Sequence, residues 1–107
     1  MKLPIIIDES GDILVFDSLE SAERHLEPID ILNGEFVGYD AEGRLLNIVP
    51  NGFIAKISLA ELEPTHADNL EKVLRDLFLD VDPSPEWVIN ASLEELIQKV
   101  LKYYKFR

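Results

Sequence analysis

The chain lacks cysteine, has few basic residues and contains no long hydrophobic run, and each absence excludes a class of protein. Without cysteine there can be no disulfide framework, no thiolate zinc site and no thiol nucleophile. Near the N-terminus only three consecutive isoleucines precede acidic residues, far fewer than the roughly 20 apolar residues of a membrane span or the apolar region of a signal peptide. We therefore expect a cytoplasmic protein that does not interact with membranes.

The shortage of basic residues is concentrated in one part of the chain. Residues 1–42 hold eleven acids against two bases, a net charge of −9, whereas residues 43–107 hold ten acids against eight bases, a net charge of −2. Binding to nucleic acid or to an anionic membrane needs Lys and Arg, so both are disfavoured. The electrostatic field of so acidic a segment favours a basic protein partner, although the same acids could serve solubility alone.

With 107 residues, 47% of them hydrophobic and 29% charged, the chain fits one folded domain spanning residues 1–107. Its glycines occur in turn contexts and show no phosphate-binding pattern, so we expect no cofactor. Calcium is disfavoured too, because the acids near residues 8–12 lack the regular spacing of an EF-hand loop.

Short apolar segments separated by turn residues predict six strands. The first two form a hairpin, and the next four are punctuated by Asn33-Gly34, residues 41–43 and Asn51-Gly52. Asn-Gly is the dipeptide best suited to a two-residue hairpin loop. The expected strands are residues 3–8, 12–17, 29–32, 35–40, 44–49 and 53–58.

Capping patterns predict three helices. A short one begins at Asp17 or Ser18 and ends before Pro28, and two longer amphipathic ones begin near Thr65 and Ser92. Trp87, in the short linker between the last two, is expected to fill the gap between them. The predicted fold class is thus α+β: an antiparallel β-meander of about six strands, one short helix after the first hairpin, and two C-terminal helices packed on the sheet.

Two histidines are the candidates for catalysis. At about 100° per residue, the acids of the first helix lie on one side of its apolar stripe and His25 on the other, so no carboxylate of that helix can orient the imidazole. His66 lies just inside the next helix, and neither histidine belongs to an HxH or HExxH pattern. We predict no catalytic residue and no metal site, and therefore no enzyme.

The acids of the first helix and of the following strand are the better candidates for a function. Aromatic side chains beside carboxylates suit an interface with Lys and Arg. The predicted partner-binding residues are Asp17, Glu20, Glu23, Glu27, Asp30, Glu35, Tyr39 and Asp40.

About a third of the chain, residues 11–46, resembles a pattern found in small bacterial proteins. The segment reads "GDILVFDSLESAERHLEPIDILNGEFVGYDAEGRLL", with landmarks at Phe16, Ser18, Ala22-Glu23, Leu26-Glu27, Asp30, Gly34-Glu35, Tyr39-Asp40 and Gly43-Arg44. It is similar to immunity proteins of contact-dependent growth inhibition and related polymorphic toxin systems. The resemblance implies an inhibitor that binds one toxin domain, often a basic nuclease, and blocks its active site.

Two other functions remain open from the sequence. One is a small enzyme that pairs His25 or His66 with a carboxylate from elsewhere in the fold. The other is an acidic regulatory or assembly subunit that binds itself through the basic segment "KYYKFR", residues 102–107. A monomer or a weak homodimer is the expected oligomeric state.

Overall fold

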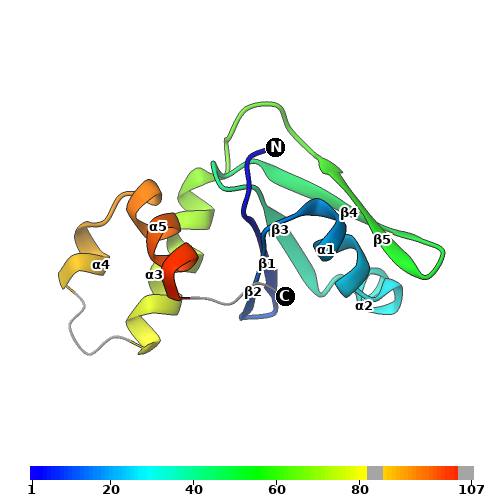
Figure 1. Cartoon of the computed structure of the whole chain (residues 1–107), viewed down its shortest axis with the longest axis horizontal. Helices are drawn as coiled ribbons and strands as arrows, with labels where there is room; N and C mark the ends of the chain where they lie inside the picture. Colours follow the sequence, from blue (N-terminus) through cyan, green and yellow to red (C-terminus); the bar gives the residue numbers. More distant parts are fainter. Residues whose placement is uncertain (82–85, 104–107) are drawn as a thin grey trace.

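The protein is a five-stranded antiparallel sheet with helices on both faces (Figure 1). The computed structural model describes residues 1–81 and 86–103, so most of the "KYYKFR" segment lies outside the described residues. The elements in chain order are β1 (Ile5–Glu9), β2 (Asp12–Phe16), α1 (Leu19–His25), α2 (Pro28–Leu32), β3 (Phe36–Tyr39), β4 (Leu45–Asn51), β5 (Ile54–Leu59), α3 (Ala67–Val81), α4 (Glu86–Asn90) and α5 (Leu93–Tyr103).

The α+β class is confirmed, but the sheet has five strands rather than six, in the order β2-β1-β3-β4-β5. A simple meander would place β2 beside β3, whereas β1 lies between them and pairs with both. The reason is the composition of β1. Ile5, Ile6 and Ile7 are all fully buried, and a strand with apolar side chains on both faces is best covered in the middle of a sheet.

The predicted strand at residues 29–32 is wrong, because this segment forms helix α2. Pro28 occupies the first turn of the helix, where its missing N–H costs no hydrogen bond. Asn33 ends the helix, and Gly34 follows with a φ of 69°, donating its N–H to the carbonyl of Ile31. The left-handed glycine that an Asn-Gly hairpin needs is equally the residue that ends a helix.

The hairpin between β4 and β5 is confirmed, with its loop displaced by one residue. Asn51 pairs with Ile54, so Gly52 and Phe53 form the two-residue turn. Gly52 has a φ of 66°, while Phe53 keeps a negative φ, which is the pattern of a type II′ turn.

The two faces of the sheet carry separate apolar clusters. Ile6, Val15 and Tyr39 pack under α3, α4 and α5, and the alternate residues of the same strands pack under α1. Helices α3 and α5 confirm the two predicted C-terminal helices, and α4 is an additional short helix. Trp87 of α4 contacts Phe78 of α3, with ring centroids 5.2 Å apart, and Lys99 of α5, so it fills the predicted gap.

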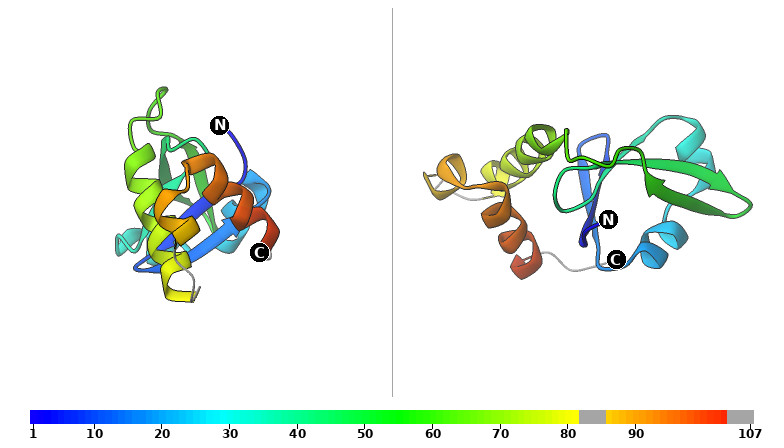
Figure 2. Two further views of the ribbon diagram at one scale, coloured as in Figure 1. Left: turned by 90° about the vertical axis from the view of Figure 1, so that its left-hand side faces the viewer. Right: turned by 90° about the horizontal axis from the view of Figure 1, so that it is seen from above.

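The C-terminal helices cover only part of the sheet, and the β4–β5 hairpin extends beyond them at the end opposite α4 (Figures 1 and 2). Helix α2 packs against β4 at this end. The side chains of Val49 and Ile54 are exposed there. The molecule therefore has a helical end and a hairpin end.

The β3–β4 turn joins these parts at Gly43. The backbone of this glycine has a φ of 93°, and a Cβ on it would lie 2.4 Å from the Cα of Ala67 at the start of α3. The carbonyl of Gly43 also accepts a hydrogen bond from the N–H of His66. The turn and the helix approach so closely that only glycine fits.

We predict that Gly43→Ala destabilises the fold much more than Gly34→Ala. Both glycines have positive φ, which costs an L-residue about 1 kcal/mol, but a Cβ at Gly34 meets open space. The clash with Ala67 should add about 1–3 kcal/mol at Gly43. Urea denaturation of the two variants measures the difference, and equal losses would contradict the close packing.

Candidate partner-binding surface

Three of the predicted binding residues are exposed acids around α1. The helix begins as expected from its capping pattern: the hydroxyl of Ser18 accepts a hydrogen bond from the N–H of Ser21, 3.1 Å away. Asp17, Glu20 and Glu27 are exposed. Glu20 forms an ion pair with Arg24 at 2.8 Å, but both side chains are 72% exposed, so solvent screens the pair and leaves Glu20 accessible.

Glu23, on the same helix, has a structural contact instead. Its carboxylate accepts a hydrogen bond of 2.8 Å from the backbone N–H of Ile57 in β5. Because β5 is an edge strand, this N–H points away from β4 and has no partner in the sheet. Glu23 therefore satisfies the open edge of the sheet and protects it from pairing with another strand.

Asp30 and Glu35 lie close together where α2 leads into β3. Their backbones are joined by a hydrogen bond from the N–H of Glu35 to the carbonyl of Asp30. A hydrogen bond between the two carboxyl groups, followed by burial and by the charges of Asp30 and Glu9, raises the pKa of Glu35. Two acids this close repel one another when ionised, so a Lys or Arg side chain placed between them would be favourable.

The other two predicted residues, Tyr39 and Asp40, lie in the interior and cannot contribute to a docking surface in this conformation. Tyr39 is 6% exposed in the cluster under the C-terminal helices. Burial, followed by the charge of Asp8, raises the pKa of its hydroxyl. Asp40 is completely buried, and its partners explain why.

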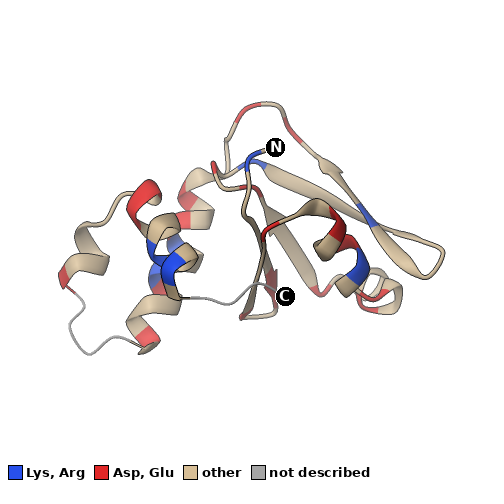
Figure 3. Cartoon of the chain, viewed as in Figure 1, with Lys and Arg blue, Asp and Glu red and all other residues tan. Residues whose placement is uncertain are grey.

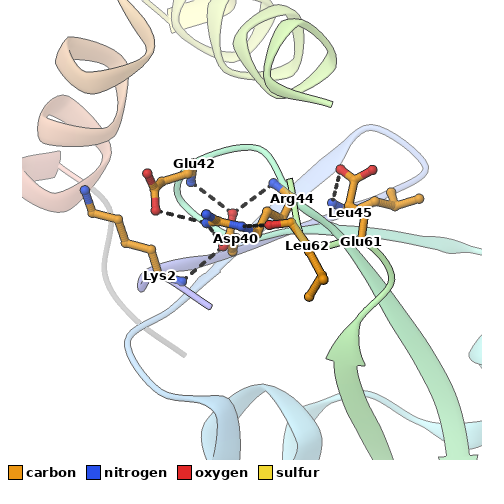
Figure 4. Close-up of polar contacts among 7 residues, drawn as sticks. All are labelled: Lys2, Asp40, Glu42, Arg44, Leu45, Glu61 and Leu62. Carbon is orange, nitrogen blue, oxygen red and sulfur yellow. Dashed lines mark hydrogen bonds and ion pairs between the residues drawn. The ribbon is translucent and has the colours of Figure 1, made fainter. Parts of the chain in front are cut away.

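Asp40 organises the β3–β4 turn (Figure 4). Its carboxylate accepts backbone hydrogen bonds from Lys2, Glu42 and Arg44, and the Arg44 guanidinium lies 3.0 Å away. Burial by itself raises the pKa of Asp40, but these bonds to the charged form outweigh it, so the pKa lies below its ordinary value. Arg44 also donates to the carbonyl of Leu62, which ties the loop after β5 to the turn.

His25 does not have the surroundings of a general base. It is exposed at the end of α1, and its ring packs at a tilt against Phe16, with centroids 5.4 Å apart. No ion pair to a carboxylate is found for it among the described residues. An aromatic contact of this kind fixes the end of the helix on the sheet.

His66 does have a carboxylate within reach, in a small polar network. Its Nδ1 lies 2.8 Å from Glu61, and the hydroxyl of Thr65 donates a short hydrogen bond to the other oxygen of the same carboxylate. Glu61 also accepts from the N–H of Leu45, 2.9 Å away. The bonds from Thr65, Leu45 and His66 outweigh partial burial and lower the pKa of Glu61 to about 2.

The Glu61 network fixes the loop between β5 and α3 against the start of β4. A cavity of about 370 Å³ lies between the N-terminus and α5, and another of about 230 Å³ lies between the β1–β2 turn and α3. His66 lines neither of them. In the part of the chain that the structure describes, no group of three or more histidines and carboxylates could hold a metal ion, and no helix is long and apolar enough to cross a membrane.

The structure also places exposed apolar side chains that the sequence interpretation missed. Phe53 at the hairpin turn is 100% exposed, and Ile29 and Leu32 on α2 are 63% and 74% exposed. A signal was present in the sequence. Phe53 directly follows the turn dipeptide Asn51-Gly52, and residues at the turn of a hairpin lie at the surface.

Comparisons with known proteins found no matching family model, no matching curated protein and no matching solved structure. The function is therefore inferred from the chain's own residues and their arrangement.

We predict that Glu23→Ala lowers the free energy of unfolding by about 1–2 kcal/mol, because the partly buried N–H of Ile57 loses its acceptor. Glu27→Ala is the matched control: Glu27 is exposed and its side chain makes no capping hydrogen bond, so the change should stay within about 0.5 kcal/mol. Urea denaturation measures both changes. If Glu23→Ala left the free energy of unfolding unchanged, Glu23 would not be a structural residue and would again be a candidate for partner binding.

The depressed pKa of Glu61 predicts a pH-dependent contribution to stability. Its ordinary value is 4.5 and its value in the fold is about 2, so the ionised form stabilises the fold fully above pH 4.5 and this contribution disappears as the pH falls toward 2. The stability difference between the natural protein and Glu61→Gln should therefore narrow over that window in denaturant titrations. A stability difference that stayed constant with pH would show that the charge of Glu61 does not contribute to the stability of the fold.

Proposed function

We propose that this protein is an inhibitor that binds a basic protein domain and blocks its active site, as an immunity protein of a bacterial toxin system does. The observation that carries the proposal is the segregation of charge: residues 1–42 hold a net charge of −9, out of −11 for the whole chain. These residues build β1, β2, α1, α2 and β3. A basic nuclease presents Lys and Arg to nucleic-acid phosphates, and an acidic surface can occupy the same groups.

The acids that still reach solvent support this proposal best. Asp17, Glu20 and Glu27 are exposed around α1, and the carboxyl pair of Asp30, on α2, and Glu35, just before β3, is half-buried. In Figure 3, acidic residues colour parts of the ribbon of α1 and α2, and α1 also carries one basic segment. We call Asp17, Glu20, Glu27, Asp30 and Glu35 the acidic face. Glu23, Tyr39 and Asp40 are left out of it, because their side chains have structural contacts or are buried.

The acidic face supports a binding protein better than an enzyme. Nucleophilic or acid–base catalysis needs groups held in a site that admits a substrate. His25 packs on Phe16, and the carboxylate partner of His66 is already occupied by Thr65 and by the N–H of Leu45. The acidic face needs no such site, because Asp17, Glu20 and Glu27 are exposed and Asp30 and Glu35 are only partly buried.

The direct test is co-expression with the product of the gene encoded immediately upstream. Copurification together with rescue of growth is the expected result. If that neighbour is demonstrably toxic and this protein neither binds it nor rescues growth, the proposal fails.

Charge reversal then tests the acidic face. We predict that the double variant Glu20→Lys, Glu27→Lys associates with the toxin about tenfold more slowly than the natural protein at low salt, because electrostatic steering raises association rates by 10-fold or more. The rate should also depend less on salt. Stopped-flow mixing at several salt concentrations measures both effects.

The matched control is the double variant Glu63→Lys, Glu86→Lys. It makes the same change in net charge at exposed positions outside the acidic face. An equal loss of rate in both double variants would assign steering to net charge alone and reject the acidic face as the docking site.

A further inference from the structure

The hairpin end of the molecule gathers apolar side chains that the fold leaves in solvent. Phe53 is 100% exposed, Leu32 74%, Ile29 63%, Val49 50% and Ile54 40%. We call these five residues the apolar tip. They come from α2 and from the β4–β5 hairpin, which are in contact: α2 packs against β4 and also contacts β5.

The residues of the apolar tip lie beside one another within each element. On the hairpin, Val49 pairs with Lys56 and Asn51 with Ile54, so Val49 and Ile54 are diagonal neighbours on one face of the ladder. On α2, Ile29 and Leu32 are three positions apart and therefore share one side of the helix. Figures 1 and 2 show α2 beside the hairpin, whose turn projects past the other elements.

Folding gives no reason for this composition. The type II′ turn requires a glycine at position 52, but position 53 accepts polar residues as readily as phenylalanine. Ile31 already packs α2 onto the cluster beneath α1, so Ile29 and Leu32 are not needed to hold the helix. Scattered exposed apolar residues are ordinary, whereas five at one projecting end are typical of an interaction site.

Charge indicates what covers the apolar tip. Glu27 and Asp30 are neighbours of Ile29 in the chain, Glu35 follows α2, and Lys56 pairs with Val49 on the hairpin. A second copy of this chain would bring another net charge of −11 to the same surface, and an anionic membrane would repel it in the same way. A basic protein surface gains from both features at once.

We propose that the apolar tip is the anchor of the interface, inserting Phe53 into an apolar pocket of a basic protein while the bordering carboxylates pair with Lys and Arg around that pocket. The inference deepens the proposed function and rests on it. Interfaces of this kind concentrate their affinity in a few buried aromatic or apolar anchors within a polar rim. Phe53 at the turn, next to Ile54 at the start of β5, has the exposure that such an anchor needs.

Photocrosslinking in the cells that naturally make this protein tests the anchor, and it does not require the partner to be known beforehand. The full chain carries p-benzoylphenylalanine in place of one residue: Phe53 or Leu32 at the tip, Glu20 on the acidic face, or Ile89 as control. Ile89, on α4 at the other end of the molecule, is 62% exposed. We expect adducts with one protein rich in Lys and Arg from the two tip positions and none from position 89.

The identified protein is then purified and its affinity measured by calorimetry. Phe53→Ser should weaken the complex at least tenfold, mostly through faster dissociation, whereas the matched Ile89→Ser should leave it unchanged. Both substituted side chains are exposed, so the unfolding transitions of the two variants should coincide with that of the natural protein.

The outcomes separate this inference from the proposed function. Adducts from position 20 with none from positions 53 and 32 would overturn the anchor and leave the acidic inhibitor standing. Adducts between two copies of the chain, or binding to phosphatidylcholine vesicles that Phe53→Ser abolishes, would assign the tip to self-association or to a lipid surface and overturn it as well. Absence of adducts from all four positions, with no copurifying toxin, would remove both proposals.

Discussion

The buried carboxylate of Asp40 is the constraint on which the arrangement of the other elements depends. It has no exposed surface, so its charge must be balanced inside the protein, and the N–H groups of Lys2, Glu42 and Arg44 do so together with the Arg44 guanidinium. The donors come from three segments: the N-terminus, the β3–β4 turn and the residue just before β4. Arg44 reaches onward to the carbonyl of Leu62, and the same turn contacts α3 at Gly43. One charge thus holds the sheet, the β5–α3 loop and the helical end in a single arrangement.

This demand for satisfied polar groups divides the acids of the chain into two kinds. Asp40, Glu23 and Glu61 accept hydrogen bonds from backbone N–H groups that find no other acceptor in the sheet. The acids of the acidic face are not needed in this way, since nothing in the fold requires a charge at Asp17 or Glu27. A count of carboxylates therefore overestimates the surface available to a partner. After the structural acids are removed, Glu20 remains on α1 and Asp30 on α2, while Asp17, Glu27 and Glu35 lie in the segments that flank these two helices.

Local sequence patterns predicted most of the helices and strands, and the errors arose where one residue type is compatible with two kinds of structure. The capping residues Ser18 and Ser92 and the amphipathic period of the last helices were sufficient for α1, α3 and α5. Gly34 was assigned to a hairpin, although a left-handed glycine ends a helix equally well, and the strand before it was consequently wrong. The contacts of Asp40 with Lys2 and of Glu23 with Ile57 join residues 38 and 34 positions apart, so no local pattern could reveal them. The unalternating isoleucines of β1, by contrast, carried readable evidence of a central strand.

The separation of the molecule into a helical end and a hairpin end matters for how a partner could be held. Long-range charge acts before contact and mainly sets the rate of encounter, whereas buried apolar area forms only in the complex and mainly sets its lifetime. The acidic face and the apolar tip meet at α2, so a protein steered by the first would arrive at the second. The polar contacts around Asp40 and Gly43 lie at the start of β4, and the turn at Gly52 lies at the other end of that strand. Because those contacts fix the start of β4 and Glu23 fixes the edge of β5, the hairpin presents Phe53 in a defined position, and less conformational entropy is lost when the anchor is buried.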